Sequence, residues 1–458
     1  MKKILIFALM LGLVTQLNAQ RPGGGAPQGG RPAAAPQSNV SNKEAETALK
    51  NYEKAKADIT GKKAQDAASW VKYGKAIVAV YDHPAKNVWV GLSALEARVI
   101  LKDQRSSGSE TKTINGDEYE VVHYQDKDLY YDGSGSLAFW NITKPLLPQD
   151  LLSEAYEAYK KAYELDTKGA QKKGITDGMT VVQNRHVANA MAANSMGNFS
   201  LSSKSFAKSI LCAEHPVINQ VDTVVVFYTG LTAYYAQEYD VALSYIQRAL
   251  NMGFSQEGTA YSYIAECYKG LGQLEKVEPT LAEGFTKYPA NQGILVSLIN
   301  LYRENDKDPS QILQYIHVAQ ENEPNNESLF YAEGDVWKKL NNLDKAVECF
   351  RKSIEINPNY LYGHFSIGTS YYDTAADLQA KAAEELDDKK YNEMIDEMDS
   401  LLVKAIDPLE KSFSLAATDP TIQSEIAVYL KFVYYRLQGL DEKYLPLYEK
   451  YRDIADGR

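Results

Sequence analysis

A period of 34 to 35 residues runs through the second half of this 458-residue chain. One small or aliphatic position recurs at intervals of 35, 34, 35 and 34 residues, at Gly230, Ala265, Ile299, Gly334 and Gly368. Prolines repeat with the same spacing at Pro289, Pro324 and Pro358. A fixed period of this length is typical of repeat proteins, in which each unit buries its apolar face against its neighbours. The chain is therefore expected to fold as a stack of similar units.

Each unit reads as two amphipathic helices joined by a short turn. Phe330 and Trp337 flank Gly334 at helical spacing, and Phe350 lies on the apolar face of a second helix. A small residue lets two helices approach closely, while an aromatic ring fills the space beside it. Pro358 then ends the second helix.

These residues resemble the tetratricopeptide repeat, a helix-turn-helix unit that stacks into a right-handed superhelix. The resemblance is strong over residues 224–372 and looser over 68–216 and 421–451. It implies an all-α solenoid of about seven units. We expect degenerate units over 41–216, regular units over 221–372 and a capping unit over 421–458.

Residues 82–150 interrupt the first unit, separating a helix at 68–81 from its partner at 151–165. Within them, Thr111–Ile114 and Glu118–Val122 flank Asn115-Gly116, a pair that favours a two-residue β-hairpin turn. A second ribbon is expected from 129–131 and 137–140. The sequence predicts a small β insertion on a helical scaffold.

A second interruption lengthens both helices of a later unit and predicts an extended helical hairpin over 361–417, with its turn near Asp387–Lys389. Pro408 is expected to kink the returning helix or to start a new segment. The expected contacts between the two arms join Leu378, Ala382 and Leu386 to Tyr391, Met394, Met398 and Leu401.

The N-terminus has the organisation of a secretory signal peptide. Met1-Lys2-Lys3 is basic, Ile4–Val14 is apolar, and cleavage is expected after Ala19. Residues 20–40 are rich in Gly, Pro and Ala and are expected to form a disordered spacer. No later stretch is apolar enough for a transmembrane segment. We therefore expect an exported protein of the periplasm or cell envelope, soluble after cleavage.

Composition excludes some functions and offers no catalytic motif. The formal net charge of -11 argues against a nucleic-acid partner, which requires clustered Lys and Arg. No two of the six histidines have metal-ligand spacing, and no phosphate loop or nucleophile motif is present. We expect no cofactor, no metal and no enzymatic activity.

The resemblance implies that side chains of the first helices line a concave surface that binds a protein or peptide partner. Alignment with the family pattern gives ten candidates: Phe227, Tyr234, Glu266, Asn300, Arg303, Tyr331, Asp335, Lys338, Phe365 and Tyr372. Three further positions, Thr223, Thr374 and Ser400, lie in triplets similar to the acceptor pattern of a periplasmic O-glycosylation system, and would then be exposed.

Three functions remain open at this point. The first is a non-enzymatic, exported scaffold for protein–protein interaction in a bacterial cell envelope. The second is an envelope glycan- or nutrient-binding protein. The third is an enzyme whose site lies in the 82–150 insertion, with Tyr119, His123, Tyr131 and Trp140 around a small pocket.

Overall fold

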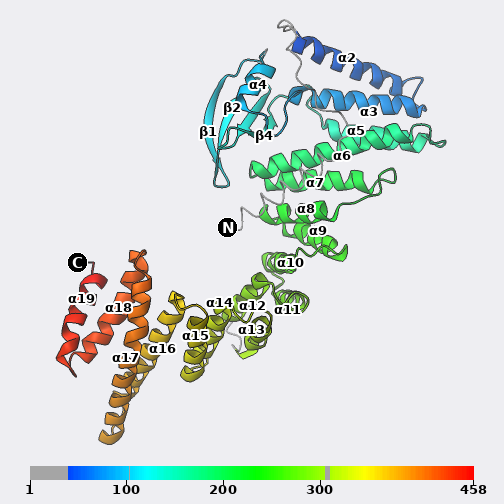
Figure 1. Ribbon diagram of the computed structural model, residues 1–458. Helices are drawn as coiled ribbons and strands as arrows, with labels where there is room; N and C mark the ends of the chain where they lie inside the picture. Colours follow the sequence, from blue (N-terminus) through cyan, green and yellow to red (C-terminus); the bar gives the residue numbers. More distant parts are fainter. Residues whose placement is uncertain (1–39, 103, 305–309, 458) are drawn as a thin grey trace. The chain divides into compact units, whose positions relative to one another are not determined.

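The computed structural model describes residues 40–102, 104–304 and 310–457, and within them it is helical apart from one small sheet (Figure 1). The expected signal peptide (1–19) and nearly all of the spacer lie outside the described residues. The chain divides into two compact units. The first unit comprises Met1–Ser255 with Glu266–Gly272, and the second comprises Gln256–Ala265 with Gln273–Arg458.

The first unit is a row of antiparallel helices that pack in chain order. Three hairpins are formed, by α3 with α5, by α6 with α7 and by α8 with α9. The predicted pairing of the helix at 68–81 with the distant helix at 151–165 is thus confirmed. The helices are α2 (Val40–Thr60), α3 (Ala67–Asp82), α5 (Leu151–Leu165), α6 (Lys172–Ser195), α7 (Phe199–Glu214), α8 (Thr223–Tyr235) and α9 (Tyr239–Asn251). Helix α2, which packs against α3, is an element that the repeat pattern did not predict.

Tyr159 of α5 fixes how closely the helices of the first hairpins approach. Its ring occupies the space beside Gly74 of α3 and Gly178 of α6. A Cβ atom at Gly74 would lie 2.6 Å from the ring, and one at Gly178 would lie 2.2 Å from it. Both distances are shorter than van der Waals contact, so the two glycines are required for this helix spacing. The small-plus-aromatic pattern of the regular repeats is therefore also present in the degenerate region.

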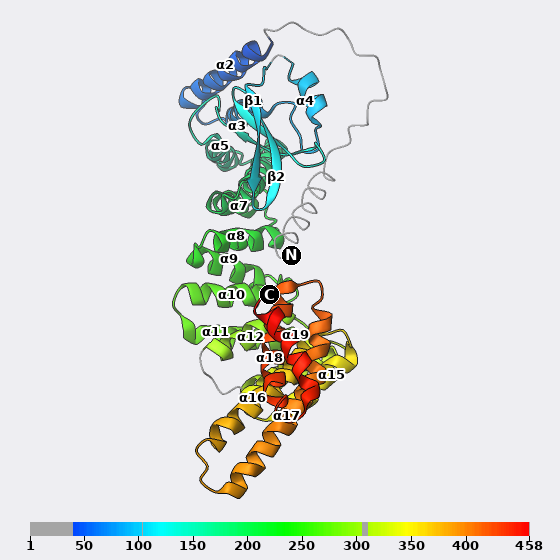
Figure 2. The same cartoon turned by 90° about the vertical axis from the view of Figure 1, so that its left-hand side faces the viewer.

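The insertion forms a four-stranded antiparallel sheet in the order β1-β2-β3-β4, in which the expected hairpin and the expected second ribbon are joined by the pairing of β2 with β3 (Figure 2). Its strands are β1 (Gly108–Ile114), β2 (Asp117–His123), β3 (Lys127–Tyr131) and β4 (Leu137–Ile142). Asn115 and Gly116 have φ values of 55° and 95°, as the tight hairpin turn requires. A short helix, α4 (Ala94–Ile100), was not predicted.

The two faces of the sheet are buried against different partners. Tyr119, Val121, Tyr130 and Phe139 form one face, which packs against Ala192 and Met196 near the end of α6. Leu129, Tyr131 and Leu137 on the other face pack with Leu92 and with Ala97 of α4. The alternation of side chains along β2 and β3 places these two sets on opposite faces. In β4 the register shifts opposite Tyr130 and Tyr131, so Leu137 and Phe139 lie on different faces although they are two residues apart. The sheet is thus fixed to the helical row through α6.

In the second unit the helices again follow one another as antiparallel hairpins. Helix α10 (Thr259–Gly270) is shared between the two units. The remaining helices are α11 (Val277–Lys287), α12 (Gln292–Glu304), α13 (Ser310–Asn322), α14 (Glu327–Lys339), α15 (Leu343–Ile356), α16 (Leu361–Ala382), α17 (Asp388–Leu415), α18 (Pro420–Leu437) and α19 (Leu445–Ala455). Short 3-10 turns occur at His83–Ala85, Leu274–Lys276 and Glu442–Tyr444.

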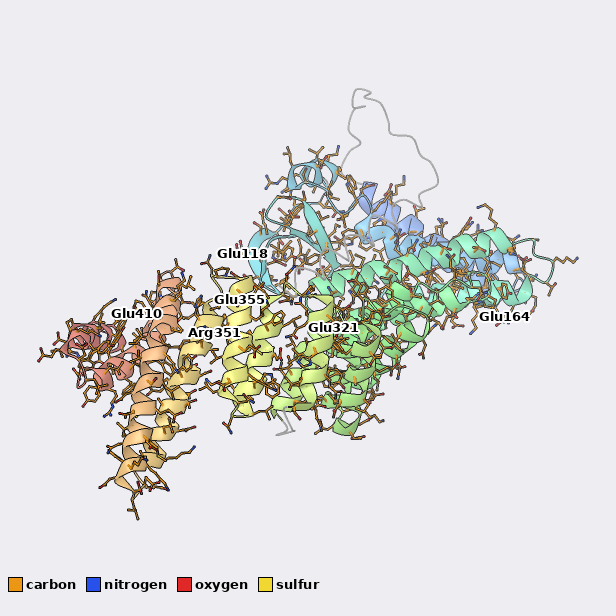
Figure 3. All side chains as sticks on the ribbon, turned by 60° about the horizontal axis from the view of Figure 1, so that its bottom comes forward. Glu118, Glu164, Glu321, Arg351, Glu355 and Glu410 are labelled. Atoms are coloured by element: carbon orange, nitrogen blue, oxygen red, sulfur yellow. The ribbon has the colours of Figure 1, made fainter. Side chains whose placement is uncertain are left out.

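The hairpin of α14 and α15 has the packing that the period predicts. The Phe350 ring is fully buried against Gly334, where an added Cβ atom would lie 2.5 Å from it. Full burial of such a side chain stabilises the fold by about 1.5–3 kcal/mol. The opposite side of α15 is exposed and charged, as Arg351 and Glu355 show in Figure 3.

The predicted long hairpin is present as α16 and α17, which run side by side in Figures 1 and 2. Asp387 begins the return helix by accepting hydrogen bonds from the Lys389 and Lys390 amides. Ala382, Met398 and Leu401 are buried as expected, but Leu386 is 96% exposed, so the contact predicted for it is wrong. Helix α17 also continues through Pro408 to Leu415 and does not start a new segment there.

Candidate functional site

The first candidate site is the surface formed by α14 and α16 of the second unit. Five predicted residues lie here, and all of them are half-buried: Tyr331, Asp335, Lys338, Phe365 and Tyr372. The Lys338 ammonium lies 2.8 Å from the Asp373 carboxylate and donates to the Thr369 hydroxyl at 3.2 Å. This polar bridge connects α14 to α16.

Aromatic rings accompany this bridge along both helices. Tyr331 contacts the rings of Tyr360 and Tyr362, with centroids 5.7 and 6.4 Å apart. Phe365 and Tyr372 both meet the Tyr429 ring of α18 edge-on, at 5.4 and 5.3 Å. Tyr362, which was not among the predicted residues, is 52% exposed. Two features of the sequence could have identified it. Tyr362 lies in the first turn of α16, and it belongs to the aromatic run Tyr360-Leu361-Tyr362.

The other predicted residues of this surface have mixed positions. Asn300 of α12 is half-buried, and the Arg303 side chain lies outside the described residues. In the first unit, Glu266 is exposed and Tyr234 is half-buried. Phe227 requires a correction, because it is fully buried against the Phe254 ring and cannot reach a partner. A loop residue outside the helical pattern thus covers this family position.

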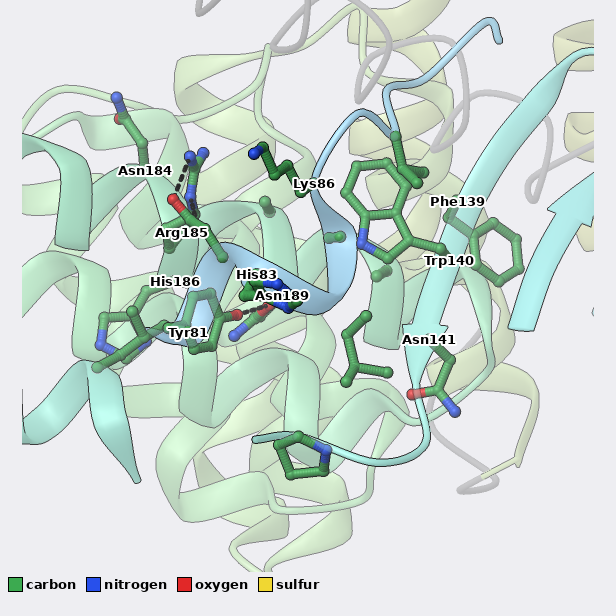
Figure 4. A pocket seen from close by; sticks show the side chains of 18 of the residues that line it. Tyr81, His83, Lys86, Phe139, Trp140, Asn141, Asn184, Arg185, His186 and Asn189 are labelled. Atoms are coloured by element: carbon green, nitrogen blue, oxygen red, sulfur yellow. Dashed lines mark hydrogen bonds and ion pairs between the residues drawn. The ribbon is translucent and has the colours of Figure 1, made fainter. Parts of the chain in front are cut away.

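The second candidate site is a cleft of about 2800 Å³ in the first unit. Its walls are one side of α2, the end of α3 with the segment after it, strand β4 with the segment leading into α5, and the facing sides of α6 and α7. Figure 4 shows Asn184, Arg185, His186 and Asn189 of α6 on one side, and Trp140 and Asn141 of β4 on the other. The cleft exists because the sheet is fixed against one end of α6. Its residues are far apart in sequence, which is why no motif predicted it.

The charged side chains of the cleft are largely neutralised within it. Five cationic and four anionic side chains line the walls. Arg185 donates two hydrogen bonds to the Asp82 carboxylate, at 2.7 and 2.9 Å, and Lys86 lies 2.7 Å from Glu44. Lys208 pairs with Asp150 in the same way. The cleft therefore presents little net charge to a ligand.

Two polar side chains of the cleft are buried without an internal partner. His186 is 4% exposed and Asn194 is 8% exposed, and both line the cleft. Within the described chain neither side chain forms a hydrogen bond, and the polar atoms of both remain in contact with solvent. Burial lowers the pKa of His186 to about 4, with Lys208 as a smaller contribution, so its imidazole is neutral at pH 7. Buried polar groups normally have partners, so these two are available to a ligand.

His83 gives the cleft a second neutral imidazole. Its Nδ1 atom is buried and has no hydrogen-bond partner among the described residues. Desolvation lowers the pKa of His83, and the nearby Lys86 acts in the same direction, while Glu44 opposes them. A neutral imidazole can both donate and accept a hydrogen bond. The cleft thus combines aromatic rings with neutral donors and acceptors.

The four residues considered for an enzyme site in the insertion do not meet in one pocket. Tyr119 and Tyr131 are buried on opposite faces of the sheet. His123 pairs with Asp128 at 2.7 Å, away from the cleft, and only Trp140 lines it. That expectation is wrong for these residues. In the described ranges, no group of three or more His, Cys, Asp or Glu side chains is arranged to hold a metal ion.

Other sequence features have simple structural positions. Cys212 and Cys267 are buried free thiols and Cys349 is a half-buried one; burial raises the pKa of Cys212 to about 12. Among the three positions in glycosylation-like triplets, Ser400 is exposed, whereas Thr223 and Thr374 are half-buried in helices. The last two differ from the expected exposure. In the part of the chain that is described, no helix is both long and apolar enough to cross a bilayer.

Residues 328–360 match the family model of the tetratricopeptide repeat. No curated protein sequence matches this chain. Among solved structures, a TPR repeats protein from Bacteroides fragilis is 18% identical, with a TM-score of 0.29, and the match covers 54% of this chain and 97% of that one. The C-terminal part of a TPR repeat-containing protein from Cytophaga hutchinsonii is 13% identical, with a TM-score of 0.39 and coverage of 61% and 93%. YrrB, described as a TPR protein with an unusual peptide-binding site, is 17% identical, with a TM-score of 0.29 and coverage of 45% and 95%.

Proposed function

We propose that this chain, whose residues 328–360 match the tetratricopeptide repeat, is a non-enzymatic scaffold that holds a protein or peptide partner in the bacterial cell envelope. The observation that carries this proposal is the surface of α14 and α16. There, aromatic rings and the Lys338–Asp373 pair remain partly exposed on adjacent first helices. Such groups give contact area and orientation to an extended polypeptide.

The rings of this surface are pre-organised for binding. Tyr331 is held by Tyr360 and by Phe350, whose centroid lies 5.6 Å away, while Tyr362 keeps half of its surface free. A partner would therefore pay little side-chain entropy to use these rings. Asp373 and Thr369 hold the Lys338 ammonium in place, and its third N–H can donate to a peptide carbonyl without breaking these contacts.

The test uses a photo-crosslinking residue, p-benzoylphenylalanine, in place of Tyr362 in cells that naturally produce the protein. A discrete protein adduct is expected after irradiation, and its yield should fall several-fold in a Lys338→Ala background. The matched control site is Tyr163, which is 41% exposed on α5 of the first unit. Equal adduct patterns from both sites, or a yield that Lys338→Ala leaves unchanged, would contradict the proposal.

Export is the second part of the proposal, and it rests on the sequence of residues 1–19. The basic start, the apolar run Ile4–Val14 and Ala19 support cleavage by a signal peptidase. Intact mass of the protein recovered from its natural source should correspond to a chain starting at Gln20, and the protein should fractionate with the periplasm or envelope. A full-length cytoplasmic protein beginning at Met1 would refute export and leave the scaffold surface untouched.

A further inference from the structure

We propose that the cleft of the first unit binds a neutral oligosaccharide. This site is separate from the α14–α16 surface, and the proposal does not depend on the scaffold function. Four features of the cleft favour such a ligand: its aromatic rings, its unpartnered polar groups, its charge balance and its size.

Two tryptophan rings line the cleft where a ligand could stack on them. Trp140 is half-buried, and its packing against the sheet core fixes its orientation. Trp89, on the segment after α3, is 45% exposed although it is a large apolar side chain. Both line the cleft. An amphipathic ring that is held in place offers apolar contact to the C–H face of a sugar without losing conformational entropy.

The polar groups of the cleft suit hydroxyl groups. Asn141, Asn184 and Asn194 line it, and none of the three forms a side-chain hydrogen bond within the described chain. Each amide both donates and accepts, as do the neutral imidazoles of His83 and His186. A ligand hydroxyl also does both, so it can satisfy these groups in either direction. A cleft whose half-buried amides have no partner within the chain favours a ligand that completes their hydrogen bonds.

The charges of the cleft argue against an ionic ligand. Arg185 and Lys86 are already paired with Asp82 and Glu44, so an anionic ligand would have to break those pairs. Lys43 is the one lining cation without an ion pair among the described residues, and it lies exposed near the start of α2. A neutral ligand avoids the desolvation of these ion pairs.

The size of the cleft indicates an oligomer rather than a monosaccharide. Its volume of about 2800 Å³ exceeds the ~300–1,000 Å³ of pockets that enclose small molecules. An extended peptide is the competing occupant, and strand addition to β4 is the obvious way to hold one. The edge of β4 is already used at Leu137, which exchanges hydrogen bonds with Gly91 and Leu92 at 2.7 and 2.9 Å. Because this edge is already occupied at Leu137, strand addition is disfavoured, and the neutral amides of the cleft favour a sugar over a peptide as its ligand.

The experiment probes full-length protein on an array of neutral and acidic oligosaccharides, followed by calorimetric titration with the best neutral hexasaccharide. Binding should be restricted to neutral glycans. Trp89→Ala and Asn184→Ala should each weaken it by about tenfold or more. The control is Leu95→Ala, which removes a more exposed apolar side chain (73% against 45% for Trp89) on α4 that does not line the cleft, and this variant should bind as the unmodified protein does. Circular dichroism checks that each variant is folded, and Asn141→Ala replaces any variant that is not.

Three results would overturn this proposal. One is that no neutral glycan is retained, or that acidic glycans are preferred. Another is that Trp89→Ala and Asn184→Ala bind as tightly as the unmodified chain. The third is retention of an immobilised peptide, competing with the glycan signal and lost in the same two variants. Lys338→Ala, which tests the scaffold surface, should leave glycan binding unchanged, so the two proposals can fail independently.

Discussion

Residues 83–150 separate the two helices of one hairpin in the first unit, whereas residues 374–402 lengthen two helices that already pair in the second. The first insertion leaves the helical period entirely and builds a sheet with a core on each face. The second extends the existing interface with the same helical spacing. An insertion that lies between two paired helices must bury its own apolar residues. An insertion that lengthens both helices of a pair only extends the contact between them.

This difference has consequences for function. The sheet contacts the helical row through one end of α6, and the space left beside that contact is the cleft. The long hairpin adds length to α16 and α17 and continues the core that these helices share. The change of secondary structure in the first insertion thus created a concave site.

The largest expected effect is on stability, and it tests whether each insertion unfolds as one cooperative unit. Phe139 stacks on Tyr130 at 4.5 Å and joins the sheet to α6. Phe139→Ala should cost about 3–5 kcal/mol and expose all four strands together to hydrogen exchange. Met398→Ala should cost about 2–5 kcal/mol but raise exchange mainly in the outer turns of α16 and α17, because repeat contacts are between neighbours. Loss of protection in a single strand of the Phe139→Ala sheet would contradict this comparison.

The second prediction concerns acid sensitivity, which should belong to the first unit. His186 is neutral in the folded protein because burial lowers its pKa to about 4, and the unfolded value is about 6.5. Between these values the unfolded chain binds a proton that the native chain does not. Stability therefore falls as pH drops from about 6.5 through 4, by up to about 1.4 kcal/mol per pH unit and about 3 kcal/mol in all.

Urea unfolding at pH 6.5 and 4.5, followed by hydrogen exchange, measures this dependence. His186→Phe should remove the contribution of His186 from helices α6 and α7, leaving the titrations that both proteins share, those of the carboxylates and of His83 and His215. Lys208 and Asp150 are the charged groups that act on His186, and their pair persists through most of this pH range. An identical pH profile for the two proteins would show that His186 is not the sensor.

The packing of the repeat core could be predicted from the sequence because a few periodic contacts determine how closely the helices approach. Gly334 and Phe350 recur at the period, and the structure places them in contact as expected. The turn at Asn115-Gly116 was equally readable, since its positive φ angles admit few residue types. These features are local or strictly periodic.

The remaining features depend on tertiary contacts that no period encodes. Helix α2 has only Tyr52, Ala55 and Ile59 in the core, so most of its length resembles a solvated segment. Phe227 occupies a family position for partner contact, yet Phe254 covers it. The cleft brings α3, β4 and α6 together from distant parts of the sequence. Such a site becomes visible only when the sheet has been placed against α6.

The third prediction tests how strictly the second unit needs its small residue. Gly334→Ala would bring a Cβ atom to 2.5 Å from the Phe350 ring and should cost about 1–3 kcal/mol, even though Ala favours helix by up to about 1 kcal/mol. The control is Gly133→Ala in the β3–β4 turn, where nothing lies within 4 Å. Thermal unfolding measures both. If Gly334→Ala were as stable as the unmodified chain, close helix approach would not explain the periodic glycine.

The smallest effect is expected at the tip of the long hairpin. The Asp387 carboxylate accepts 3.0 Å hydrogen bonds from the Lys389 and Lys390 amides, which have no helical partner of their own. Asp387→Ala should cost about 1 kcal/mol locally, and Asp387→Asn should restore most of it, because an amide oxygen also caps. Hydrogen exchange should rise in the first turn of α17 only, since Leu386 beside it is exposed and anchors nothing. If the loss of this cap opened the hairpin as far as Met398, the tip would be coupled to the core, and the second insertion would share the cooperativity attributed above to the sheet alone.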